Sequence, residues 1–407
     1  MASLTPMMRQ YLDIKEQYKD CILFFRLGDF YEMFFNDAEI ASRELEITLT
    51  GRDCGLDERA PMCGVPFHSA EIYITKLINR GFKVAICEQV EDPALAKGIV
   101  KRDVIRVVTP GTIIESSMLD GKKNNYLMCI CKRKFCFGVS TVDVSTGEFS
   151  AANINWGNTP AKLIDEIARF SPSEIIVNSE LYNDAGLLEN IKKRFGAYIS
   201  TIDDSYFADG FAALKIKSYF QDSDILEKEA DLLVNSSGAL LEYLEQTQKA
   251  AIKHIKTIDI YKLEEFMALD ISTRRNLELT ETIREKSRKG TLLWVLDKTV
   301  TPMGGRMLKK WMEQPLKNMP DIQERLYAVR EYKEKFMMRM EIRELLKRVH
   351  DIERLAGKIA LGNANCRDLI SLKNSIGQIP YIKNIMKDCR AELNKMNHER
   401  LDALEDV

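Results

Sequence analysis

The spacing of apolar and polar positions divides the chain into three stretches of different character. Residues 1 to about 112 alternate short extended runs with short helical ones. Strands are predicted over residues 22–27, 82–87 and 101–108, and helices over residues 37–46 and 69–79. We therefore expect the first stretch to be a small mixed α/β domain.

A polar, turn-rich segment at residues 120–125 predicts a linker to the second stretch. Three strand-like runs follow the linker, and alternating helical and extended runs come after them. The predicted strands are 126–132, 135–144, 148–154, 174–177 and 197–201, and the predicted helices are 160–169 and 187–195. Three antiparallel strands followed by alternating helices and strands are typical of a ribonuclease-H-like sheet.

Strand patterns disappear beyond about residue 225, and the last third has a helical pattern. Apolar residues from Leu326 to Ile359 recur at steps of three to five, which predicts one long helix entered after Pro320. The chain stops without a capping glycine, so we expect it to be part of a longer polypeptide. The expected fold class is multidomain, α/β plus all-α, with domains at residues 1–115, 120–255 and 256–407.

Composition agrees with a soluble protein of several domains. The 407 residues exceed one ordinary core, and hydrophobic residues make up 45% and charged residues 29%. Because no apolar run reaches membrane-spanning length and no signal peptide is evident, we expect a cytoplasmic protein without membrane contact. Nine irregularly spaced cysteines argue against a disulfide framework, and four histidines without a CxxC pair do not indicate a metal site. Cys129 and Cys131 are expected to be small buried hydrophobes.

The formal net charge of -2 does not by itself indicate a nucleic-acid binder. The balance is nevertheless uneven, because residues 261–407 carry 29 Lys and Arg against 23 Asp and Glu, whereas residues 1–112 carry 14 against 17. A basic last third permits local contact with phosphates, although many helical domains carry such a surplus on a solvated face.

The most informative segment is residues 24–35, where aromatics surround the carboxylate of Glu32 and a Gly28-Asp29 turn separates two apolar runs. Pattern alone leaves two interpretations open. Aromatics of paired strands usually fill a core. Alternatively, Phe30 is held at a surface, with Glu32 two residues on, and faces a flat, partly unstacked partner such as a nucleobase.

Several longer motifs resemble one family in the same order. These are TPMMRQY at residues 5–11, FRLGDFYEMF at 25–34, PMCGVPFH at 61–68, VAICEQ at 84–89, VVTPGT at 107–112 and GTLLWVLDKT at 290–299. Together they resemble the MutS family of DNA mismatch repair proteins from residue 5 onward. Motifs of this length, in the same order along the first and the last stretch of the chain, shift the interpretation of the Phe30 segment toward function.

The resemblance implies a role for each part of the chain. Residues 1–115 would be the mismatch-recognition domain, 120–255 a connector with a ribonuclease-H-like fold, and 256–407 the first part of a helical core or lever domain. In this family a Phe stacks on the mispaired base from the minor groove of kinked DNA and a Glu hydrogen-bonds that base; these roles fall on Phe30 and Glu32.

Other side chains near the motif receive less specific expectations. Arg52, Lys97 and Arg102 are candidate contacts to the DNA backbone, although each is equally compatible with a solvated surface charge. Phe67 lies in a nearby motif, and core packing is the expected role for it. We expect no catalytic, cofactor-binding or metal-binding residue in this chain.

The resemblance also defines what the chain lacks. MutS proteins carry an ATPase domain, but no G-x-x-x-x-G-K-[ST] sequence occurs here, so ATP and Mg²⁺ are expected only for a domain outside this chain. The implied partners are mismatched double-stranded DNA and a MutL-type protein bound through the connector. The family's homodimer depends largely on other domains, so we expect this chain alone to be monomeric and to bind DNA weakly.

Two competing interpretations remain at this point. A ribonuclease-H-like sheet can hold paired metal ions on carboxylates, so a metal-dependent nuclease centred on Asp143 is one alternative. A purely structural scaffold is the other, and it predicts that the Phe30 ring is buried.

Overall fold

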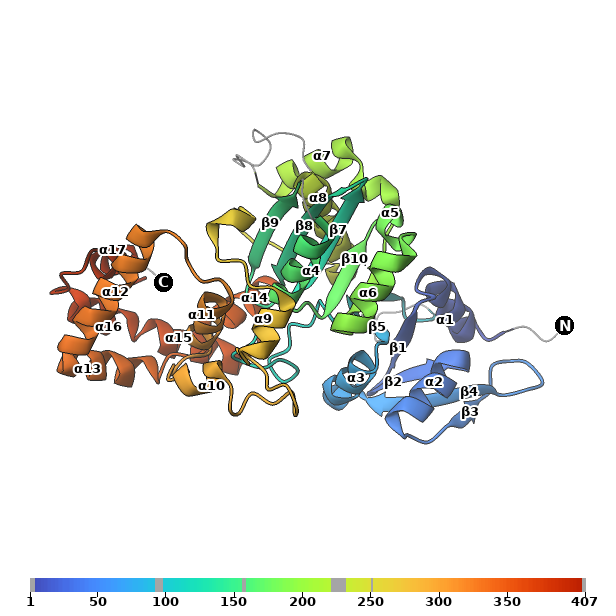
Figure 1. Ribbon diagram of the computed structural model, residues 1–407. Helices are drawn as coiled ribbons and strands as arrows, with labels where there is room; N and C mark the ends of the chain where they lie inside the picture. The colour runs from blue at the N-terminus through green and yellow to red at the C-terminus, as the bar shows by residue number, and fades with distance from the viewer. Residues whose placement is uncertain (1–3, 92–97, 156–158, 221–231, 250–251, 405–407) are drawn as a thin grey trace.

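A computed structural model describes residues 4–91, 98–155, 159–220, 232–249 and 252–404. The chain forms an N-terminal domain (residues 4–117), a middle domain (residues 125–260) and a helical region (residues 261–404). Figure 1 shows the middle domain between the other two parts. The expected fold class, two α/β domains followed by an all-α part, is confirmed. Among the described residues, no helix combines the length and the apolar character needed to cross a bilayer.

The N-terminal domain is a six-stranded sheet with helices on both faces. Its helices are α1 (Pro6–Gln17), α2 (Phe35–Leu45) and α3 (Ala70–Asn79), and its strands are β1 (Cys21–Leu27), β2 (Phe30–Phe34), β3 (Thr50–Arg52), β4 (Ala60–Pro66), β5 (Lys83–Gln89) and β6 (Arg102–Val108). The strand order is β3-β4-β2-β1-β5-β6, in which β1 and β5 are parallel and the other neighbours antiparallel.

Alternation along β1 and β2 sends their side chains into two separate cores, as the pleat of a strand requires. Phe25 and Phe34 pack on the α1 face, where Tyr11 meets both rings edge-on. Phe24 and Met33 pack on the opposite face with residues of α2 and α3. Both faces are therefore covered over most of their length.

The middle domain contains a second six-stranded sheet, ordered β11-β10-β7-β8-β9-β12. Its strands are β7 (Leu127–Arg133), β8 (Cys136–Asp143), β9 (Glu148–Ile154), β10 (Glu174–Val177), β11 (Tyr198–Thr201) and β12 (Asp259–Ile260), and its helices are α4 (Thr159–Phe170), α5 (Ser179–Tyr182), α6 (Ala185–Phe195), α7 (Asp209–Tyr219) and α8 (Leu232–Gln248). The expected order, three antiparallel strands followed by alternating helices and strands, is present, and β10 pairs in parallel with both β7 and β11. Strand β12 corrects the expectation that strands end by residue 225, because it pairs with β9.

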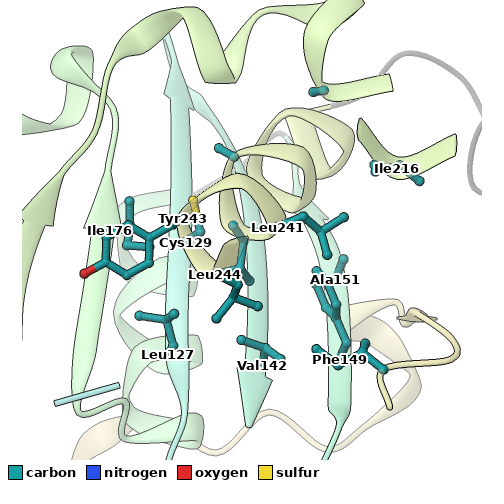
Figure 2. Packing of buried hydrophobic residues seen from close by; sticks show 14 of the residues in the cluster. Leu127, Cys129, Val142, Phe149, Ala151, Ile176, Ile216, Leu241, Tyr243 and Leu244 are labelled. Carbon is teal, nitrogen blue, oxygen red and sulfur yellow. The ribbon is translucent and has the colours of Figure 1, made fainter. Parts of the chain in front are cut away.

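Helix α8 forms the centre of the larger middle-domain core. Figure 2 shows Leu241, Tyr243 and Leu244 of this helix above side chains of the sheet, among them Cys129 of β7. Cys129 and Cys131 are both buried in this cluster, as expected, and the nine cysteines are free thiols. Burial raises the pKa of the Cys129 thiol, so it acts as a small apolar side chain.

A buried carboxylate connects the N-terminal domain with the middle domain. Glu174 of β10 is fully buried and accepts hydrogen bonds from the backbone N–H of Gly111 (3.0 Å) and the hydroxyls of Ser200 (2.6 Å) and Tyr243 (2.6 Å). The Thr109 hydroxyl also donates to it. Since Thr109 and Gly111 come from the N-terminal domain, these bonds fix its last strand against the middle-domain sheet.

The helical region contains nine α-helices within the described residues. They are α9 (Ile271–Asn276), α10 (Leu292–Leu296), α11 (Pro302–Glu313), α12 (Met319–Glu334), α13 (Phe336–Leu346), α14 (Ile352–Ala360), α15 (Cys366–Ile376), α16 (Ile379–Met386) and α17 (Glu392–Arg400). The prediction of one long helix after Pro320 is wrong, because α12, α13 and α14 are separate.

Side chains account for both breaks. At the first, the Arg339 guanidinium donates to the carbonyl oxygens of Tyr332 (2.9 Å) and Lys333 (3.2 Å), which the end of α12 leaves without helical partners. At the second, the Asp351 side chain accepts from the backbone N–H of Arg354 and caps α14. The apolar stripe survives both breaks, so periodicity alone could not detect them.

The predicted linker at residues 120–125 is where the helical region meets the middle domain. Lys122 Nζ lies 2.9 Å from an Asp297 carboxylate oxygen. Arg354 is buried and donates to the carbonyl oxygens of Asp120 (3.0 Å) and Lys123 (2.7 Å). Residues 120–123 are therefore fixed to the helical region by hydrogen bonds and an ion pair and do not form a free linker.

Candidate nucleic-acid interface

The candidate site is built on the hairpin of β1 and β2. Leu27 pairs with Phe30 across a two-residue turn at Gly28 and Asp29. Gly28 has a φ of +57°, a left-handed conformation that side chains disfavour and that two-residue hairpin turns require. The Gly-Asp pair thus fixes the register that places Phe30 at the tip of β2.

Phe30 is the exposed aromatic of the hairpin. Its relative exposure is 47%, whereas Phe24, Phe25 and Phe34 are fully buried. The scaffold alternative predicts a buried ring at this position, and the structure does not agree with that prediction. A rigidly mounted, half-exposed aromatic is suited to stacking on a planar partner.

Glu32 lies on the same face of β2, because side chains two residues apart point to one side of a strand. Its carboxylate is mostly covered, with a side-chain exposure of 17%, and it forms an ion pair with Arg52. Gly64 is the residue opposite it on β4. A Cβ at Gly64 would lie 3.3 Å from the carbonyl oxygen of Tyr31 and 3.4 Å from Cγ of Glu32, so the glycine leaves room for the carboxylate.

The three predicted backbone contacts have different outcomes. Arg52, at the end of β3, has a side-chain exposure of 39% and lies with Cζ 6.0 Å from the centroid of the Phe34 ring. Lys97 lies outside the described residues. Arg102 is buried, which contradicts the prediction that it is a surface contact to DNA.

Protein acceptors hold Arg102 in its buried position. It donates to the carbonyl oxygens of Arg26 (2.7 Å) and Val100 (3.0 Å) and to Oε1 of Gln10 (3.0 Å), and its Cζ lies 5.0 Å from the Phe25 ring centroid. Burial lowers the pKa of Arg102, and the nearby Arg52 guanidinium lowers it further. Arg102 therefore supports the sheet beneath the site.

Sequence reasoning missed a second exposed aromatic beside the turn. Phe67 is 40% exposed, which corrects the expectation that it packs in the core. Its backbone N–H donates to the carbonyl oxygen of Asp29 at 3.0 Å, and the Arg26 guanidinium stacks on its ring at 3.7 Å. The signal was Pro66, because β4 ends there and the in-out alternation no longer applies to Phe67.

Glu88 of β5, the strand that pairs with β1, holds Arg26 in place. Its Nη1 lies 3.3 Å from Oε1 of Glu88, and the Tyr31 hydroxyl donates to the same carboxylate. Burial, together with the hydrogen bond to Glu88, raises the pKa of Tyr31. The Arg26 guanidinium is thus already held in position against the Phe67 ring.

The structure gives no support to the nuclease alternative. Asp143 is fully buried, and its oxygens accept from Ser145 N (2.9 Å) and Oγ (2.6 Å), Asn124 Nδ2 (2.9 Å) and Asn125 N (3.2 Å). These bonds order the turn after β8 and leave little capacity for a metal. Within the part of the chain that the structure describes, no three His, Cys, Asp or Glu side chains are grouped to hold a metal ion.

Comparison with known proteins covers all three parts of the chain. Residues 5–117 match MutS domain I, residues 125–256 match MutS domain II, and residues 272–406 match MutS domain III. The chain is similar over its full length to proteins named DNA mismatch repair protein MutS. Identity is 65% for the one from Acetivibrio thermocellus, 64% for that from Ruminiclostridium cellulolyticum and 52% for that from Alkaliphilus oremlandii.

The chain spans about half the length of these curated relatives, since 47% of each is covered. The three matches follow one another along the chain in the order I, II, III. Domain I corresponds to the N-terminal domain, domain II to the middle domain and domain III to the helical region. The chain therefore belongs to the MutS family of DNA mismatch repair proteins and carries domains I, II and III of that family.

Proposed function

We propose that this chain recognises mismatched duplex DNA through its N-terminal domain. Phe30 stacks on the mispaired base from the minor groove, and Glu32 hydrogen-bonds that base in kinked DNA. The observation that carries the proposal is the half-exposed Phe30 ring at the tip of a rigid hairpin, with Glu32 on the same face. Family membership supports the choice of DNA as the partner.

The energetics of DNA distortion explain why such a site prefers a mispair. Inserting an apolar wedge at a base step costs a few kcal/mol, and bending the site costs roughly 1 to 6 kcal/mol. A mispair has already lost part of its pairing and stacking, so the same distortion costs less there. Stacking on an aromatic returns about 1 to 3 kcal/mol per base. The kinked complex is therefore favoured at a mismatch and disfavoured on ordinary duplex.

Glu32 adds a second criterion. A carboxylate is repelled by phosphates and by the acceptor atoms of paired bases, so it contributes favourably only where a base presents a donor or a protonated nitrogen. A mispaired base, displaced from its partner, can present such a group. The rest of the proposal concerns the whole protein, for which we infer ATP hydrolysis, a homodimer and a MutL-type partner bound through the middle domain.

The decisive experiment substitutes Phe30 and compares two duplexes that differ in one base pair. Fluorescence anisotropy titrations of the purified chain with matched and G·T-mismatched duplex give the ratio of the two dissociation constants. We expect Phe30→Ala to bring this ratio to about one, because the stacking term is lost.

The matched control is Phe135→Ala, which removes an aromatic that is 84% exposed in the middle domain. It should leave the ratio unchanged, and circular dichroism should show both variants folded. A Phe30→Ala variant that still discriminates between the duplexes would refute the proposed function.

A further inference from the structure

The Glu32 carboxylate has an ionic partner within the protein. Glu32 of β2 and Arg52 of β3 form an ion pair although β4 lies between their strands. Arg52 Cζ lies 6.0 Å from the centroid of the Phe34 ring, and Gly64 on β4 leaves room for the Glu32 side chain. The positions of the three strands and the glycine at residue 64 therefore bring Glu32 and Arg52 together on this face of the sheet.

The two partners differ in how firmly they are held. Glu32 is mostly covered, whereas Arg52 is the more exposed member of the pair, at 39% against 17%. Among the described residues, the Arg52 side chain donates to one protein acceptor, the Glu32 carboxylate. The neighbouring Arg102 side chain donates to three protein acceptors. Of these two guanidiniums, Arg52 is the one that can leave its acceptor.

We propose that Arg52 is the positioning residue of Glu32. It holds the carboxylate folded against the sheet while no DNA is bound, and it transfers its guanidinium to a duplex phosphate when Glu32 turns to the mispaired base. A guanidinium can bind either partner because its planar fork matches carboxylate and phosphate oxygens alike. This inference rests on the proposed function of Phe30 and Glu32.

This exchange couples the contact of Glu32 with the mispaired base to the contact of Arg52 with the phosphate. On matched duplex no base is displaced from its pair toward Glu32, so the ion pair stays closed and Arg52 does not reach the phosphate. On mismatched duplex both contacts form together. Arg52 therefore contributes to discrimination, whereas an ordinary backbone contact strengthens binding to both duplexes equally.

A double-mutant cycle on the ratio of matched to mismatched dissociation constants tests the coupling. We expect Arg52→Ala to lower this ratio about fivefold in the wild-type background and to leave it within about twofold in a Glu32→Gln background. Arg52→Lys, which keeps the charge without the fork, should give an intermediate ratio. Equal loss of affinity for both duplexes in the wild-type background would overturn the inference.

The salt dependence of binding supplies a readout that a purely structural role would not change. Arg52→Ala should lower the salt slope by about 1 for mismatched duplex and leave the slope for matched duplex unchanged. The matched control is Arg59→Ala, because Arg59 is exposed just before β4 and forms no ion pair among the described residues. This variant should keep the wild-type ratio, and a loss as large as that of Arg52→Ala would overturn the inference.

The outcomes separate this inference from the proposal beneath it. A wild-type chain that prefers the mismatch and loses its preference with Phe30→Ala, but not with Arg52→Ala, refutes the role of Arg52 alone. A wild-type chain without any preference refutes both.

Discussion

The N-terminal domain buries a larger share of its apolar side chains than the helical region does. In the N-terminal domain both faces of the sheet are filled, and Phe24, Phe25 and Phe34 are fully buried. In the helical region a small cluster around Ile342 and Ile382 is buried. Exposed large apolar side chains are spread along its helices, including Trp294, Trp311, Leu326, Tyr327, Val329, Phe336 and Met337.

The difference shows when an exposed aromatic is informative. In the N-terminal domain the aromatic rings other than Phe30 and Phe67 are buried or half-buried, so an exposed ring such as Phe30 departs from the local rule and is a candidate for a binding surface. In the helical region, exposure is the local rule, so the exposed ring of Phe336 identifies no particular site. The same exposed fraction thus has different meanings in the two parts.

The largest effect expected from this comparison is on stability within one hairpin. Phe24→Ala should cost about 3–5 kcal/mol, because it leaves a cavity in a filled core. Phe30→Ala should stay within about 0.5 kcal/mol, because its ring is half exposed. Peptide-resolved hydrogen exchange of the N-terminal strands measures both, and equal costs would mean that Phe30 is a core residue after all.

The next effect concerns how the helical region is held together. Glu331 of α12 accepts from the backbone N–H of Arg390 (2.6 Å) and Ala391 (2.9 Å), from Asn394 Nδ2 (3.0 Å) and from Lys335 Nζ (2.8 Å). Burial opposes ionisation, but these donors prevail and lower the pKa of Glu331 from its ordinary 4.5 to about 2. A lowered pKa in the folded state stabilises the fold above about pH 4.5, and this stabilisation is lost as the pH falls toward 2.

We therefore expect Glu331→Gln to destabilise the helical region by about 1–3 kcal/mol at neutral pH, since four donors lose a charged acceptor. Thermal melts followed by circular dichroism at pH 6 and pH 3 should show a smaller acid-induced loss in the variant than in the wild type. An identical loss in both would show that other carboxylates govern the acid response.

A smaller effect is expected at the second aromatic of the site. Phe67→Ala should weaken binding to matched and mismatched duplex alike by about two- to fivefold, because it removes apolar surface and the stacking partner of Arg26 but no contact to the mispaired base. The anisotropy titrations that test Phe30 also test this prediction. A selective loss for the mismatched duplex would assign Phe67 to the reading of the mispair itself.

The smallest effect is expected on the exposed face of the helical region. Leu326→Ala should change stability by no more than about 0.5 kcal/mol, because the Leu326 side chain is largely exposed. Hydrogen exchange of α12 peptides provides the measurement. A cost above 1 kcal/mol would mean that this face is covered in solution and would weaken the contrast between the two regions.

Local patterns predicted the strands β7 to β11 of the middle domain closely but missed β3 and β4 of the N-terminal domain. Residues 148–154 and 174–177 form β9 and β10 with the predicted bounds, because alternation and turn residues act within a few positions. The helix breaks after α12 and α13 escaped detection because their causes, Arg339 and Asp351, leave the apolar stripe intact. Strand β12 escaped because its two residues are extended only by pairing with β9.

The sequence by itself determined the family resemblance, the order of the three parts and the identity of Phe30 and Glu32 as candidates, since these depend on contiguous residues. Only the tertiary structure decided that Phe30 is exposed, that Arg102 is buried and that Arg52 pairs with Glu32. The reason is physical: exposure and pairing depend on which strands become neighbours. β3, β4 and β2 are brought side by side by the sheet, although 20 residues separate Glu32 from Arg52 along the chain.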